Sequence, residues 1–321
     1  MEEYDFYPPK PELIEAKPKG NLALTVFSVV LFVIAFLLVF TEEVNFIIYF
    51  LVVLLTHELG HFTMMKAFGY KNVRMLFIPL MGAFVQGSKE EYSQKQSLIV
   101  IGAGPFPGII LGFGFILLAS LFQEVWMVNL GLLFLFLNLM NLIPLDPLDG
   151  GQLFKLLMKH NHDLFLLIFS FVSSLVLIIV GWLIDEYMLI LFGFIMGFRV
   201  RSIQNQYHLR KELRAEEINY KTTYKLLSNK DFQRIKNVLL ERSNALRTYV
   251  DNVSEEEAKP LLASQVNSVL VSPVKKDASL FFKISIIFFW LVSLITPLVL
   301  LLVYLEKIME YYDWYFKAIQ G

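Results

Sequence analysis

The chain has 321 residues, of which 56% are hydrophobic and 18% are charged, and its formal net charge is −1. A mean hydropathy of +0.57 is too apolar for an ordinary soluble domain of this length and indicates a polytopic helical membrane protein. The balanced charge gives no electrostatic basis for binding nucleic acid. The sequence contains no cysteine, which excludes disulfides and thiolate ligands, so a metal would have to be held by His, Asp or Glu.

Residues 1–21 come first, and their charged, proline-rich composition predicts a short cytosolic tail rather than a cleaved signal peptide. Apolar runs follow that are long enough, or nearly so, to span a bilayer. They lie at 22–40, 44–66, 98–122, 126–143, 164–183, 187–198 and 284–305. The third run is interrupted by GAGPFPG at 102–108, a composition that predicts a kink or a break.

Basic residues alternate between the connections of these predicted spans. Lys and Arg number three in 1–21, four in 67–97, two in 144–163 and fifteen in 199–278, whereas the connections between them hold none. By the positive-inside rule this pattern predicts an N-terminus in the cytosol and a C-terminus outside. The aromatic residues of the last stretch, 306–321, suit an interfacial tail.

Residues 201–278 differ from the rest, with 14 basic and 10 acidic residues and a helical spacing of apolar residues between 232 and 246. Before the last span we therefore expect a small cytosolic helical domain, to which a regulatory partner could bind. The predicted fold class is all-α and polytopic, with about seven transmembrane helices. The predicted domains are a tail at 1–21, a transmembrane core at 22–200, the helical domain at 201–278, a last span at 279–305 and an interfacial tail at 306–321.

The sequence THELGH at 56–61 closes the second apolar run. In a helix His57 and His61 lie on one face, so that both imidazoles reach one zinc ion, while Glu58 can act as a base on a water molecule. Ionisable groups at such depth in a membrane are functional by default. The alternative is that the two histidines merely cap the span at the lipid interface.

A hydrolytic zinc site normally has three protein ligands, so a third must come from elsewhere. The other histidines, at 160–162 and at His208, indicate an interfacial loop and a surface position. The stretch NLMNLIPLDPLDGG at 138–151 lies at the cytosolic end of the fourth predicted span, on the same side as the first two histidines. Asp149 is followed by two glycines that allow close backbone approach, which makes it the favoured ligand, and Asp146 is the competing acid.

With these two motifs the sequence resembles the site-2 protease family of intramembrane zinc metalloproteases. HELGH at 57–61 fits that family's zinc helix, and NLIPLDPLDGG at 141–151 fits its second signature. IGAGPFPG at 101–108 and PLMGAFVQ at 79–86 are similar to the elements that the family carries between them. The resemblance covers about 44–160, roughly a third of the chain.

The resemblance implies one zinc ion per chain with the ligands His57, His61 and Asp149, and Glu58 as general acid/base. The implied function is hydrolysis of peptide bonds in or near transmembrane segments of membrane-protein substrates, that is, regulated intramembrane proteolysis. We expect a multi-pass protein of the bacterial cytoplasmic membrane, with its N-terminus and its active site toward the cytosol. Its partners would be the lipid bilayer and a transmembrane or membrane-associated substrate.

By the same resemblance, Asn141 and Asn138 would help to place the substrate, and the alternative for each is a hydrogen bond within the helix bundle. The extended stretch at 79–86 either pairs with an unwound substrate as an added strand or is an ordinary loop.

Three other functions compete with this prediction. A membrane protease of the other HExxH group would need a glutamate ligand on a later helix, and Glu186 lies on the wrong side in the predicted topology. A catalytically inactive scaffold or chaperone of the same fold would have lost a metal ligand or Glu58, and neither is lost. A transporter would show inverted repeats, and the sequence has no such symmetry.

Overall fold

The structure is a computed structural model that describes residues 7–14, 22–39, 44–78, 82–157 and 162–320. These residues are mostly helical, and six helices among them are long and apolar enough to cross a membrane. A shorter apolar helix, α1 (Leu22–Val39), precedes them. The predicted fold class, a polytopic helical membrane protein, is therefore confirmed, whereas the count of seven spans is not.

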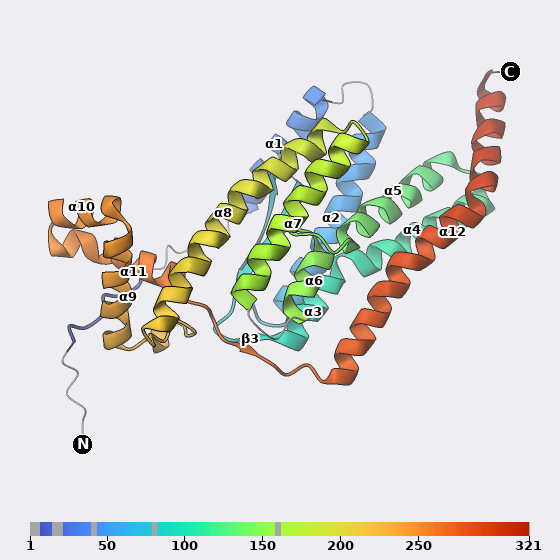
Figure 1. Cartoon of the computed structure of the whole chain (residues 1–321). Helices are drawn as coiled ribbons and strands as arrows, with labels where there is room; N and C mark the ends of the chain where they lie inside the picture. Colours follow the sequence, from blue (N-terminus) through green and yellow to red (C-terminus); the bar gives the residue numbers. More distant parts are fainter. Residues whose placement is uncertain (1–6, 15–21, 40–43, 79–81, 158–161, 321) are drawn as a thin grey trace. The chain divides into compact units, whose positions relative to one another are not determined.

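The chain divides into two compact units (Figure 1). One unit, called here the helical unit, is formed mainly by residues 163–275 together with residues 7–14 of the tail. The other, called here the membrane unit, is formed mainly by residues 22–89, 93–157 and 276–320.

The membrane unit contains the two sequence motifs. After α1 its helices are α2 (Val44–Ala67), α3 (Gln94–Ala103), α4 (Pro105–Phe122), α5 (Val125–Leu142), α6 (Asp149–Leu157) and α12 (Leu280–Gln320). The break that the sequence predicts within 102–108 lies at Gly104, between α3 and α4. The side chains of the aromatic cluster beyond residue 310 lie outside the described ones.

A β-hairpin joins α2 to α3, an element that the all-α prediction does not include. Its strands β1 (Lys71–Ile78) and β2 (Gly82–Ser88) are antiparallel, with Phe77 opposite Ala83. Residues 79–81 of the extended stretch lie outside the described residues, and the remainder of that stretch belongs to β2.

The core of the membrane unit packs the middle parts of α2 and α5 together. Phe32, Val53, Phe77 and Phe134 pack together in its apolar centre and are nearly inaccessible. α4 and α5 approach closely because Gly112 lacks a side chain, whose Cβ would lie 2.8 Å from the Leu135 side chain. These contacts hold the helix that carries the histidines against the helix that precedes Asp149.

The helical unit begins with two long helices, α7 (His162–Leu183) and α8 (Tyr187–Ala215). The sixth predicted span, 187–198, is only the first part of α8, which continues as one helix to Ala215. A 3-10 turn η1 (Tyr224–Leu226) and helices α9 (Asn229–Arg242), α10 (Asn244–Asn252) and α11 (Glu255–Val269) follow. Two short strands, β3 (Tyr92–Ser93) and β4 (Val274–Lys275), complete the described elements.

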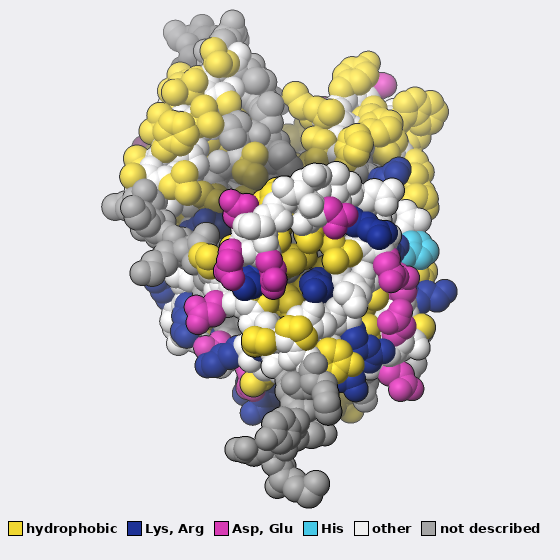
Figure 2. Space-filling model, turned by 90° about the vertical axis from the view of Figure 1, so that its left-hand side faces the viewer, with side chains coloured by type: hydrophobic (Ala, Val, Ile, Leu, Met, Phe, Trp, Pro, Cys, Tyr) yellow, Lys and Arg dark blue, Asp and Glu magenta, His cyan; other side chains and the backbone are white. Residues whose placement is uncertain are grey.

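The helices of the helical unit enclose a separate apolar core, which includes Leu213, Phe232, Ile235 and Val266. The hydroxyl of Ser254 accepts from the backbone of Glu257, whose side chain accepts from the backbone of Ser254, so α11 starts with a capping box. Figure 2 shows basic and acidic side chains interspersed over the end of the molecule that carries α9–α11. Such mixing is typical of a solvated surface.

Candidate metal centre

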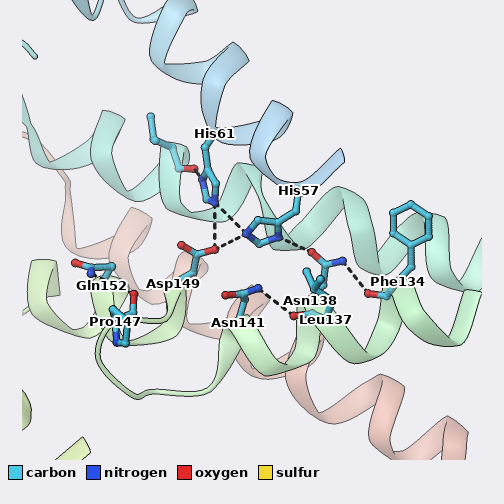
Figure 3. Close-up of polar contacts among 10 residues, drawn as sticks. His57, His61, Phe134, Leu137, Asn138, Asn141, Pro147, Asp149 and Gln152 are labelled. Atoms are coloured by element: carbon cyan, nitrogen blue, oxygen red, sulfur yellow. Dashed lines mark hydrogen bonds and ion pairs between the residues drawn. The ribbon is translucent and has the colours of Figure 1, made fainter. Parts of the chain in front are cut away.

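His57 and His61 lie one helical turn apart on α2, and both side chains are buried. Their Nε2 atoms are 3.1 Å apart. Asp149, the first residue of α6, brings its Oδ2 atom to 3.1 Å from His57 Nε2 and 3.2 Å from His61 Nε2 (Figure 3). The structure thus gathers three of the predicted site residues from two helices into one cluster.

Glu58 follows His57 on α2 and is also buried, with 5% of its surface exposed. Because successive residues of a helix point about 100° apart, Glu58 does not face the same way as the two histidines. It is not a member of the cluster, so it is open to a role other than holding a metal.

The two glycines after Asp149 bring α6 against the loop that leads from α5. A Cβ on Gly150 would lie 2.1 Å from the carbonyl oxygen of Leu142, and one on Gly151 would lie 2.2 Å from that of Leu145. A residue with a Cβ does not fit such spaces without a backbone shift, whereas glycine does. The close approach that the Gly-Gly pair suggests is therefore present, and it places Asp149 at the start of α6.

Asp146, the competing acid, lies elsewhere. It is 2% exposed and forms an ion pair with Lys155 of α6, which is itself buried. The metal-ligand cluster among the described residues contains Asp149 and not Asp146. The ion pair instead connects the loop before α6 to the body of that helix.

Each histidine is oriented by a hydrogen bond from its other ring nitrogen. His57 Nδ1 donates to Asn138 Oδ1 at 2.8 Å, and His61 Nδ1 donates to the carbonyl oxygen of Val100 at 2.8 Å. Both partners are oxygen atoms that only accept, so each of the two neutral imidazoles carries its proton on Nδ1. The Nε2 lone pairs are therefore left to face Asp149.

Asn138 has no exposed surface, and both ends of its amide are used. Its Oδ1 accepts from His57, and its Nδ2 donates to the carbonyl oxygen of Phe134 at 2.7 Å. Asn141 is partly exposed, and its Nδ2 donates to the Leu137 carbonyl oxygen at 3.1 Å. The structure thus places Asn138 beside a candidate metal ligand, whereas Asn141 is the one of the pair with exposed surface.

Gly104, at the junction of α3 and α4, has a role that the sequence analysis missed. A Cβ there would lie 2.3 Å from His61 Nε2 and 2.9 Å from His57 Nε2. Gly108 similarly leaves room for Asn138, whose Nδ2 would lie 2.1 Å from an added Cβ. The glycines of IGAGPFPG were the available signal, but they predicted only a break in the helix and not its contact with the histidines.

The donor set fits a zinc ion. With both Nδ1 atoms protonated, three acceptor atoms converge within 3.2 Å, an arrangement that repels unless a cation lies among them. Asp149 Oδ2 is buried and makes no hydrogen bond to any described residue. Tetrahedral zinc with bonds of about 2.0–2.2 Å keeps its ligand atoms roughly 3.3–3.6 Å apart, close to the spacing found here.

Comparison with known proteins relates part of the chain to a peptidase family. Residues 45–126 match the model of peptidase family M50. The chain is 32% identical over 134 residues to stage IV sporulation protein FB of Bacillus subtilis, an alignment that covers 40% of this chain and 45% of that protein. It is 31% identical over 125 residues to a zinc metalloprotease of Methanocaldococcus jannaschii, which covers 37% of this chain and 35% of that protein.

The chain spans less than half the length of these two curated relatives. Among solved structures, the site-2 protease from Methanocaldococcus jannaschii aligns over 56% of this chain and 87% of that chain, with 22% identity and a TM-score of 0.43. Asp149 lies beyond the segment that the family model matches, whereas His57 and His61 lie within it. The resemblance noted in the sequence is confirmed at the level of a domain: residues 45–126 match peptidase family M50, the site-2 protease family.

Proposed function

We propose that this protein is an intramembrane zinc metalloprotease that cuts peptide bonds in or near transmembrane segments of membrane proteins. One observation carries the proposal, namely the convergence of His57 Nε2, His61 Nε2 and Asp149 Oδ2 in a family M50 domain. These residues would hold one zinc ion per chain. The relative that is named a zinc metalloprotease supports the choice of metal.

Bound zinc would supply Lewis-acid chemistry, polarising the scissile carbonyl and making a water molecule more acidic. Glu58 then takes the proton of the attacking water and passes it to the leaving amine. Asn138 and the Val100 carbonyl hold the two imidazoles in the tautomer that the ligands require. Asn141 remains the candidate for contact with the substrate.

The substrate must unwind before it can react, because the amides of a helix are bonded internally. β2 pairs with β1 on one side only, and its other edge pairs with no strand in the described parts of the chain. We propose that this edge, over residues 82–88, receives the unwound segment as an added strand. Paired in this way, the substrate segment would hold its peptide bond in the extended form that hydrolysis needs.

The site would face the cytosol of a bacterium, in its cytoplasmic membrane, because basic residues alternate between the connections in the N-in pattern. The substrates would be transmembrane or membrane-associated proteins, and residues 201–278 would contact a regulatory partner. An inactive scaffold is the less favoured reading, since His57, Glu58, His61 and Asp149 are all present.

The test is the metal content of the detergent-purified full chain, measured for the wild type, Asp149→Ala and Glu58→Gln. We expect one zinc ion per chain in the wild type and in Glu58→Gln, and none retained by Asp149→Ala. Glu58→Gln should lose cleavage of a membrane-protein substrate and instead retain that substrate bound. A folded wild type without stoichiometric metal would remove the protease mechanism and leave the scaffold.

A further inference from the structure

Residues 7–14, YPPKPELI, lie against the rest of the helical unit, and their central lysine makes several of the contacts. The Nζ atom of Lys10 donates hydrogen bonds to three backbone carbonyl oxygens, those of Tyr224 (2.7 Å), Lys225 (3.1 Å) and Leu227. It also lies 5.4 Å from the centre of the Tyr224 ring. The three N–H bonds of an ammonium group are therefore matched by three acceptors and one aromatic ring.

These carbonyls belong to η1 and to the residue that ends it. The Tyr224 carbonyl oxygen also accepts from the Leu227 backbone N–H at 3.3 Å. Carbonyl oxygens at the C-terminal end of a helical turn attract cations. Tyr224 and Leu227 are buried, and the Tyr224 ring packs edge-on against Phe232 in the apolar core, with ring centres 6.0 Å apart. The three carbonyl oxygens and the Tyr224 ring, called here the lysine pocket, are thus anchored in the core of the helical unit.

The other hydrogen bonds of the tail are made by its backbone atoms, at Lys10 and on either side of it. The Lys10 backbone N–H donates to Asn229 Oδ1 at 2.9 Å, and the Tyr224 hydroxyl donates to the Pro11 carbonyl oxygen at 2.7 Å. Burial raises the pKa of Tyr224 to about 12, so its hydroxyl remains a donor at neutral pH. Gln233 Nε2 donates to the Pro8 carbonyl oxygen at 3.4 Å.

The tail itself is weakly buried. Lys10, Pro11 and Leu13 are partly buried, and Tyr7, Pro8, Pro9, Glu12 and Ile14 are exposed. Proline-rich segments are extended before they bind, so docking costs them little conformational entropy. The tail is held by a few hydrogen bonds and by Leu13, which packs against the apolar core. A segment with so few contacts opens more readily than the core beneath it.

We infer that the helical unit contains a recognition site for an extended peptide in which a lysine is flanked by prolines, and that residues 7–14 are its displaceable intramolecular ligand. The lysine pocket recognises the positive charge and the three N–H donors of an ammonium group. An arginine carries its donors on a planar fork and does not match three converging carbonyls. A tethered ligand has an effective concentration near millimolar, so it fills even a weak site.

The test uses the full chain, whose lack of cysteine allows an unambiguous cross-link. Pro8→Cys and Gln233→Cys together place two thiols where the tail crosses α9, and their rate of disulfide formation under a mild oxidant reports docking. We expect Lys10→Ala and Lys10→Arg each to slow the cross-link at least about tenfold. Glu12→Gln, a change at an exposed position of the same tail, should leave the rate unchanged.

A synthetic peptide of residues 5–14 tests displacement in the same cysteine pair. At millimolar concentration it should slow the cross-link at least about twofold, and the same peptide with Lys10→Ala should have no effect. Equal cross-linking rates with Lys10 and with Lys10→Ala would overturn the lysine pocket. If the cross-linking rate depends on Lys10 but no peptide alters it, the tail is not displaceable and is a permanent part of the fold. Zinc content and proteolysis are not involved, so these outcomes are independent of the proposed enzyme.

Discussion

Asn138 connects the metal cluster to the interior of α5, since its amide contacts both His57 and the Phe134 carbonyl. Asn138→Ala would leave the Nδ1–H of His57 without its acceptor and would free the imidazole to turn. Loss of such an orienting partner typically weakens metal binding by about 10–100-fold. We expect a loss of this size for zinc, measured by competition with a chromophoric chelator.

Asn141→Ala is the matched control, because Asn141 lies three residues further along α5 and contacts neither histidine in any described hydrogen bond. It should retain the wild-type affinity for zinc. Should Asn138→Ala also bind zinc as tightly as the wild type, Asn138 would not orient His57.

Gly104 leaves the space in which the two histidines meet Asp149. Gly104→Ala would place a methyl group 2.3 Å from His61 Nε2, so either α2 or the α3–α4 junction must shift. We expect zinc to be lost from a chain that still folds, as measured by metal content and helical circular dichroism. The control is Gly114→Ala on α4, where an added Cβ meets nothing within 4 Å and zinc should be retained.

The sequence was sufficient to predict that His57 and His61 share one face of a helix, because a spacing of four residues specifies that face regardless of what surrounds it. Asp149 could be favoured over Asp146 since only Asp149 precedes two glycines. The role of Gly104 could not be predicted, because it depends on which helix crosses α2 at that height. The contact of Asn138 with His57 could not be predicted either, because the two residues lie 81 positions apart along the chain.

At the scale of elements, α6 is attached to the preceding loop by the buried pair of Asp146 and Lys155. Removing one member of a buried ion pair typically costs about 3–5 kcal/mol, whereas replacing both by apolar groups is often nearly neutral. Asp146→Ala should therefore lower the melting temperature strongly. The double variant with Lys155→Met should recover most of that loss.

The measurement is thermal unfolding of the detergent-purified protein, followed at equal zinc occupancy. A double variant as unstable as Asp146→Ala alone would mean that the pair itself does not stabilise α6. The result would also separate the two acids of the motif, since Asp149→Ala should affect zinc binding more than stability.

The long helices could be predicted to within a few residues at most of their ends, because an apolar run must be about as long as the bilayer is thick. α8 and α12 are the exceptions: polar residues continue α8 to Ala215, and α12 runs on from the predicted span to Gln320, so composition marks only the apolar part of each helix. The hairpin of β1 and β2 and the nine-residue α6 were not predicted. Elements this short depend on contacts with the rest of the unit more than on their own sequence.

For the whole molecule, the charge pattern predicts which connections face the cytosol. Asp185→Cys and Asp251→Cys each introduce a single thiol at an exposed position of an otherwise cysteine-free chain. In intact cells a membrane-impermeant maleimide should label Asp185→Cys and should label Asp251→Cys only after lysis. The opposite pattern would invert the proposed orientation and place the metal cluster at the outer face.

One contact in the membrane unit gives the protein an optical signal of its own. Trp290 of α12 is buried, donates its indole N–H to the Leu142 carbonyl at 2.9 Å, and meets the ring of Phe154 on α6 edge-on at 5.4 Å. Trp126 and Trp182 are exposed, so Trp290 is the buried one among the tryptophans whose side chains are described. A movement of α6, and with it of Asp149, would therefore change the surroundings of Trp290 and with them its intrinsic fluorescence, without any added label.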